Sequence, residues 1–95
     1  MKGQSDYTLT EFIMIKKLHE LRSGECGTVI SLTPEVSNME SRLRALGFMG
    51  GERVSKTMES PLGDPSAYLI KGSVIALRSH DAAGILIRPE VRDES

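Results

Sequence analysis

The side chains that could bind a transition metal are Cys26, His19, His80 and the acidic residues near them. A protein site for such a metal normally needs three or four ligands that converge on one point. The sequence contains no Cys-x-x-Cys and no His-x-x-x-His spacing, and His80 and Asp81 are adjacent, so on a strand they would point apart. We therefore predict no dedicated metal site and no other bound cofactor.

Nucleophilic catalysis would require Cys26 to lie beside a base and an orienting group in one cleft. No histidine is close to Cys26 in the sequence, and no glycine-rich segment has P-loop spacing. Arg42, Arg44 or Arg78 could act in trans at the active site of another protein. We favour the interpretation that these arginines are ordinary solvent-exposed residues on a helix and at a strand end. We predict that the chain is not an enzyme and has no catalytic residue.

Composition argues against two classes of binding protein. The 12 basic and 13 acidic residues give a formal net charge of −1, whereas nucleic-acid binders show a basic excess. The aromatic residues Tyr7, Phe12, Phe48 and Tyr68 are too few to line a proline-rich peptide groove or to stack bases. We therefore expect no nucleic-acid partner, and an RNA-binding barrel is the weakest alternative.

Location is also constrained by the sequence. No apolar run approaches the roughly 20 residues that cross a bilayer. The N-terminus shows no apolar segment of the kind found in secretion signals. A single cysteine, Cys26, leaves no internal disulfide, which favours a reducing cytoplasm.

Short β-prone runs joined by Gly, Pro and Asp predict the strands. They lie at 27–32, 52–58, 67–70, 73–77 and 85–87, and Lys71-Gly72-Ser73 predicts a hairpin reversal. Val54 and Met58 share one face with Lys56 between them, so the second run is expected to be partly buried and at a sheet edge.

One convincing helix is predicted after the first strand. Ser37 and Glu40 have capping-box spacing, and Met39, Leu43 and Leu46 form one apolar stripe. Gly47 is placed to end this helix in a left-handed conformation, with the residue after it folding back onto the stripe. Two shorter helical turns are expected, one around Leu18–Leu21 and one at 79–83 with Ser79 as its cap.

This order of elements predicts a mainly β fold. We expect a small SH3-like barrel of about five strands, with one inserted α-helix and one short helical turn, and an OB-type barrel as the nearest competitor. Residues 1–14 are expected to be a mobile lead-in, residues 15–89 the barrel domain and residues 90–95 a polar tail. A barrel of this size has little room for a buried site, so function is expected on its surface.

Four ordered motifs resemble the FeoA family, ferrous iron transport protein A. They are Leu-Arg-Ser-Gly-Glu-Cys-Gly-Thr-Val at 21–29, Arg-Leu-Arg-Ala-Leu-Gly-Phe-Met-Gly-Gly-Glu-Arg-Val at 42–54, Pro-Leu-Gly-Asp-Pro at 61–65 and Gly-Ser-Val-Ile-Ala-Leu-Arg at 72–78. The resemblance covers about Leu18 to Ile87. Gly50-Gly51 departs from the family's usual Pro-Gly pair, which leaves that turn less rigid.

The resemblance implies an SH3-like barrel in a small cytoplasmic protein that acts with FeoB, the membrane ferrous-iron transporter with a G-protein domain. It also implies kinship with the C-terminal domain of iron-dependent repressors. The expected function is non-enzymatic docking on the cytoplasmic part of FeoB, reaching the membrane only through that transporter, with modulation of its assembly or activity. The alternative is a metal-responsive regulatory module that partners a DNA-binding repressor.

A docking protein needs exposed residues that fit a partner. The candidates are the segment near the N-terminus, the helix, the turn after it, the Pro61–Pro65 loop and a strand end. Leu43 and Leu46 of the helix are expected to plug the end of the barrel instead. The predicted partner-binding residues are Leu18, Leu21, Phe48, Met49, Leu62 and Arg78. Self-association through barrel edges is left open.

Overall fold

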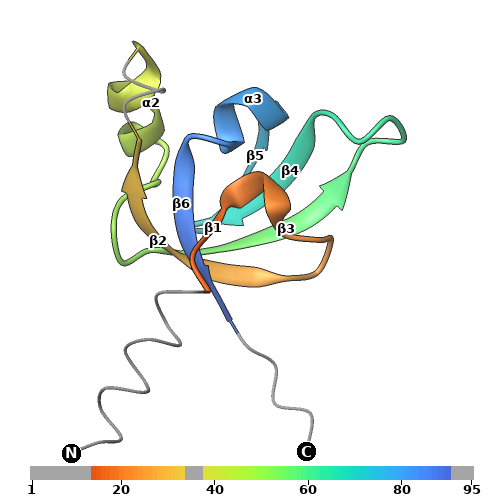
Figure 1. The fold of residues 1–95 in the computed structure, drawn as a ribbon. Helices are drawn as coiled ribbons and strands as arrows, with labels where there is room; N and C mark the ends of the chain where they lie inside the picture. Colours follow the sequence, from red (N-terminus) through yellow and green to blue (C-terminus); the bar gives the residue numbers. More distant parts are fainter. Residues whose placement is uncertain (1–13, 34–37, 91–95) are drawn as a thin grey trace, which may run out of the picture.

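The computed structural model describes residues 14–33 and 38–90, which form one six-stranded antiparallel sheet with three short helical segments (Figure 1). The strands are β1 (Lys16–Lys17), β2 (Cys26–Leu32), β3 (Arg53–Glu59), β4 (Ser66–Ile70), β5 (Ser73–Leu77) and β6 (Ile85–Pro89). The helical segments are the 3₁₀ turn η1 (Leu18–Glu20), α2 (Glu40–Ala45) and α3 (Ser79–Ala82). The mainly β prediction is confirmed.

The strand order is β1-β6-β2-β3-β4-β5, so β1 and β5 are the two ends of the sheet. The strand β3 pairs with both β2 and β4, and the prediction of an edge position for it is wrong. The register shifts between Lys56 and Met58, and a bulge of this kind moves the next side chain to the other face. Val54 is therefore buried while Met58 is 61% exposed.

The hairpin between β4 and β5 has the predicted reversal. Ile70 pairs with Ser73, which leaves Lys71 and Gly72 as a two-residue turn with φ values of 50° and 79°. Positive φ at both positions matches the twist of a type I′ hairpin. Glycine accepts this conformation freely, and Lys71 is the one described non-glycine residue that adopts it.

The helix α2 presents its apolar stripe to the sheet. Leu43 is fully buried, and Met39 and Leu46 pack against the core from its sides. Gly47 has a φ of 112°, and the Phe48 N–H donates to the Leu43 carbonyl at 3.0 Å, which closes the helix end as predicted. Ser37 of the predicted capping box lies outside the described residues, and Met39 occupies the N-cap position with no side-chain cap.

One core fills the space enclosed by the curved sheet, η1, α2 and α3. Its members are the apolar side chains with at most 6% exposure: Leu18, Leu21, Val29, Leu43, Phe48, Val54, Tyr68, Ile70, Leu77, Ala82, Ile85 and Ile87. Burial raises the pKa of the Tyr68 hydroxyl to about 12, so this residue stays neutral over the physiological range. No helix within the described ranges is long and apolar enough to span a bilayer.

The cap of α3 comes from another loop. Ser79 is the first residue of α3, not its cap, and its N–H donates to Asp64 Oδ1 at 2.7 Å. The prediction that Ser79 caps this turn is therefore wrong. The carboxylate satisfies one of the free N–H groups at the helix start and ties the β3–β4 loop to α3.

We expect Asp64→Ala to lower the free energy of unfolding by about 1 kcal/mol, the usual effect of losing such a cap. Asp64→Asn keeps an oxygen acceptor and should lose less. Urea denaturation of the three proteins measures the difference, with amide exchange at Ser79 as the local readout. Equal stability of the wild type and Asp64→Ala would contradict this role.

Candidate functional site

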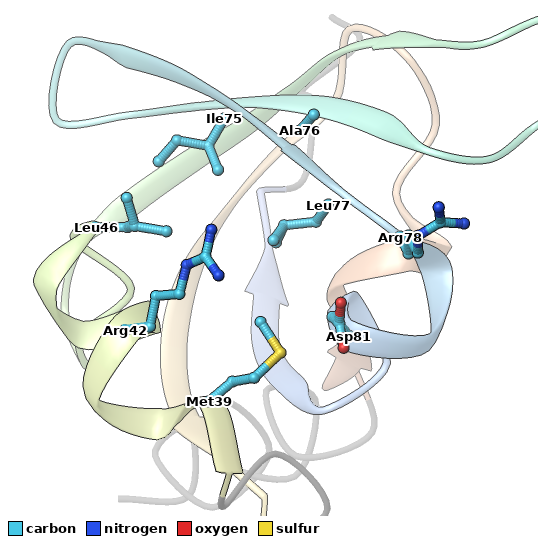
Figure 2. Close-up of a pocket in the computed structure, with 8 residues that line it drawn as sticks. All are labelled: Met39, Arg42, Leu46, Ile75, Ala76, Leu77, Arg78 and Asp81. Carbon is cyan, nitrogen blue, oxygen red and sulfur yellow. The ribbon is translucent and has the colours of Figure 1, made fainter.

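An open groove of about 410 Å³ lies between α2 and the end of β5 (Figure 2). Met39, Arg42 and Leu46 of the α2 region form one wall. Ile75, Ala76 and Leu77 of β5 form the other wall, and Arg78 and Asp81 stand where β5 runs into α3. Figure 2 shows the side chains of Leu46, Arg42 and Met39 directed toward those of Ile75 and Leu77.

The groove follows from how each wall is anchored in the core. Leu43 is held at full burial, so the residues on either side of it along the helix, Met39 and Leu46, are only partly covered. On β5, Leu77 is 6% exposed and Ile75 packs partly against the core. Each wall therefore has a side chain anchored in the core, and the groove surface combines partly covered apolar side chains with the exposed Arg42 and Arg78.

The rim of the groove carries unequal charge. Arg42 and Arg78 are both exposed, against a single acid, Asp81. Among residues 14–33 and 38–90, neither arginine has a carboxylate within salt-bridge distance, whereas the neighbouring Arg44 is paired with Glu40 at 2.9 Å. Two planar guanidinium groups are thus available to bind a carboxylate at this rim.

The six predicted partner-binding residues separate into two groups. Leu18, Leu21 and Phe48 lie in the core with exposures of 0%, 2% and 0%. Their side chains offer no surface in this conformation, because apolar residues beside a turn pack inward as readily as those in strands. We therefore leave these three out of the proposed docking surface.

The other three predicted residues are on the surface. Met49 is 43% exposed in the turn after α2, and Leu62 is 93% exposed in the β3–β4 loop. Arg78 is exposed at the groove itself. The groove lining includes Arg78 but neither Met49 nor Leu62, so the predicted residues do not form one continuous site.

Two clusters of polar side chains lie outside the groove. Cys26 is half-buried and accepts a contact from an Arg53 nitrogen at 3.3 Å, and Arg53 is paired with Glu90. Hydrogen bonding within this pair lowers the pKa of the Glu90 carboxyl and raises that of Arg53. Within the described ranges, no group of three His, Cys, Asp or Glu side chains could hold a metal ion.

The second cluster surrounds Lys56, which is 3% exposed. Its Nζ donates to the carbonyls of His19 at 3.2 Å and Leu21 at 2.8 Å, and it lies 2.9 Å from Glu59 Oε2. The same ammonium lies 6.0 Å from the centre of the Tyr68 ring. The arrangement fixes η1 to the sheet and is structural.

Sequence reasoning missed most of the groove. The helix with Met39 and Leu46 was considered as docking exterior but left out of the predicted partner-binding residues, and Ile75 and Ala76 were interpreted only as strand. One usable signal was present, because the run Ser73–Leu77 contains no charged residue and no proline. Sheet-edge strands usually carry such residues to prevent pairing with other chains.

The comparisons with known proteins agree with this fold. The sequence matches the FeoA domain family over residues 16–89. It is 32% identical to the FeoA protein of Chlorobium tepidum, whose solution structure matches with a TM-score of 0.72 and coverage of 82% of this chain and 73% of that chain. A search of curated protein sequences found no match.

A second relative is FeoA of Stenotrophomonas maltophilia, crystallised with zinc. It is 29% identical, with a TM-score of 0.70 and coverage of 81% of this chain and 98% of that chain. It is described as a prokaryotic SH3 domain protein possibly acting as a ferrous iron transport activating factor. The repressor IdeR of T. acidophilum matches in fold alone, at 14% identity and a TM-score of 0.70, and this chain covers 34% of it. With a family match across nearly all of its described residues, this chain belongs to the FeoA family.

Proposed function

We propose that this protein is a non-enzymatic, cytoplasmic accessory factor of ferrous iron uptake that docks on the cytoplasmic part of a FeoB-type transporter. Docking would alter the assembly or activity of the transporter. The observation that carries the proposal is the α2–β5 groove, whose walls combine apolar side chains with two arginines that have no carboxylate partner among the described residues. The role suggested for the S. maltophilia relative supports the same assignment.

The chemistry of the groove suits protein docking. Apolar side chains held in place by the core lose little conformational freedom when a partner covers them. Arginine at the rim contributes directional bonds to carboxylates, and this residue type is enriched where interfaces concentrate their binding energy. Outside the groove lining, Met49 in the turn after α2 offers a further adaptable apolar side chain that is 43% exposed.

The direct test is a titration of the ¹⁵N-labelled chain with the cytoplasmic domain of the FeoB-type transporter from the same genome. We expect saturable binding, with shifts concentrated at Leu46, Ile75 and Leu77, and a defect in ferrous iron uptake on deletion of the gene. An unrelated G-protein domain is the control. No binding at several hundred micromolar, together with normal uptake in the deletion strain, would remove the proposal.

A metal-responsive regulatory module is the second candidate, because the S. maltophilia relative was crystallised with zinc. It predicts a saturable site with about one ion per chain. Calorimetry with ferrous, manganous and zinc ions separates the two functions, since a docking factor binds none of them stoichiometrically.

A further inference from the structure

We infer that the docking partner adds one extended segment to the free edge of β5, as an extra strand lying in the α2–β5 groove. This inference rests on the proposed function and specifies how that docking is made. It starts from the position of β5, which pairs with β4 on one side and with no other described strand. The lining of the groove places its free side next to α2.

The hairpin register identifies the main-chain groups that are open to a partner. Ile70 and Ser73 flank the two-residue turn and therefore form a hydrogen-bonded pair. Pairs alternate along an antiparallel ladder, so Val74 and Ala76 direct their N–H and C=O groups away from β4. No main-chain bond outside the strand ladders involves either residue within the described ranges. Two donors and two acceptors thus lie along the free edge of β5, and of these two residues Ala76 also lines the groove.

The side chains beside this edge define the chemistry of the segment. An added strand presents alternate side chains to one face, where Ile75 and Leu77 meet Leu46 across the groove. Apolar residues at alternate positions would cover this surface. The rim carries two positive residues, Arg42 and Arg78, and one negative residue, Asp81. Charge complementarity therefore favours a partner segment with a carboxylate side chain next to its apolar positions.

A second copy of this chain fits the edge less well than a single segment. Pairing β5 with the β5 of another copy would bring the β4 of that copy alongside as well. The helix α2 forms the opposite wall of the groove through Met39, Arg42 and Leu46, so that space is already occupied (Figure 2). A single added strand needs about 4.8 Å of width beside β5, whereas a second sheet needs at least twice that. The occupant is therefore an extended segment of the partner protein.

Hydrogen exchange is the first test, using the full chain and the transporter's cytoplasmic domain as the probe. Strand addition should slow exchange of the Val74 and Ala76 amides at least tenfold in the complex, because both become hydrogen-bonded. The Leu69 amide, on β4, serves as the internal reference. Binding of the domain without any change at Val74 and Ala76 would overturn the inference and leave the proposed function standing.

Two variants complete the test. Val74→Pro removes an N–H that β4 does not use, and proline is tolerated at such positions of edge strands. It should therefore fold but bind the domain about tenfold more weakly, as expected for a lost interface hydrogen bond and a blocked edge. Val74→Thr keeps the N–H and is the matched control. Equal affinity of the two variants would contradict strand addition.

Arg42→Glu should weaken binding about tenfold at low salt, with the difference shrinking as salt screens the charges. Arg22→Glu makes the same change of net charge at an exposed position outside the groove and should bind as the wild type does. Protection of Val74 and Ala76 that rises with protein concentration in the absence of the domain would assign the edge to a second copy and overturn the partner assignment. No binding of the domain would overturn both this inference and the proposed function.

Discussion

Replacing Lys56 with alanine is expected to lower the free energy of unfolding by about 3 kcal/mol. The Lys56 ammonium donates to two carbonyls, those of His19 and Leu21, at the end of η1. Hydrogen bonds from a charged donor are worth more than neutral ones, and the alanine variant leaves the buried acceptor of Leu21 without a partner. It also leaves a cavity where the buried side chain of Lys56, which pairs across the strands with Tyr68, had lain.

Lys56→Met separates the two contributions to this loss. Methionine refills most of the volume, so the difference between the Met and Ala variants reports the cavity, and the remaining difference from wild type reports the hydrogen bonds. Lys16→Ala, at an exposed lysine, is the control and should change stability by less than about 0.5 kcal/mol. Urea denaturation gives all four values.

Amide exchange supplies the local readout for Lys56. The Leu21 N–H donates to the Leu18 carbonyl at 3.1 Å and closes η1. If Lys56 holds η1 on the sheet, the Leu21 amide should exchange faster in both Lys56 variants. The increase in its exchange rate should exceed the increase that the lower global stability alone would produce. A Lys56→Ala protein as stable as the Lys16→Ala control would show that the buried ammonium contributes nothing.

The part of the fold that sequence could predict is the part encoded locally. The β-prone runs with Gly or Pro boundaries located β2 to β6 but not the two-residue β1, and the Lys71-Gly72 reversal located the hairpin. The Met39, Leu43 and Leu46 spacing located α2 and its buried face. In each case the determining residues lie within a few positions of one another.

The features that sequence could not predict join distant segments. Lys56 was expected on a partly exposed face, because a lysine rarely finds carbonyls to bind in a core, and here they come from residues about 35 positions earlier in the chain. Ser79 was expected to cap its own turn, whereas the acceptor is Asp64, which lies 15 positions away. Neither pairing leaves a pattern in the local sequence.

The candidate site shows the same limit. Its walls come from residues 39–46 and 75–81, which meet only after the sheet has folded. Sequence reasoning placed Arg78 on the docking surface but included Leu18 and Leu21, which the structure buries. Apolar residues next to turns can serve either a surface or a core, and only packing distinguishes the two.

Phe48 and Met49 offer the sharpest test of that distinction, since both were predicted to bind the partner. Phe48 is fully buried beside Leu43, and truncation of a buried phenylalanine costs about 3 to 5 kcal/mol. We expect Phe48→Ala to lower the free energy of unfolding by this amount, a large share of the total stability of a small domain. Phe48→Leu should cost less and stay folded.

Met49→Ala is the matched change at the next position. Because Met49 is 43% exposed, its truncation should alter stability by less than about 0.5 kcal/mol. Its effect should appear instead as weaker binding of the transporter's cytoplasmic domain, while folded Phe48→Leu binds as the wild type does. The opposite result would be weaker binding by Phe48→Leu together with unchanged stability of Phe48→Ala. It would show that Phe48 contacts the partner and does not maintain the core. Denaturation and titration of the same three variants therefore decide which of the two neighbours maintains the core and which contacts the partner.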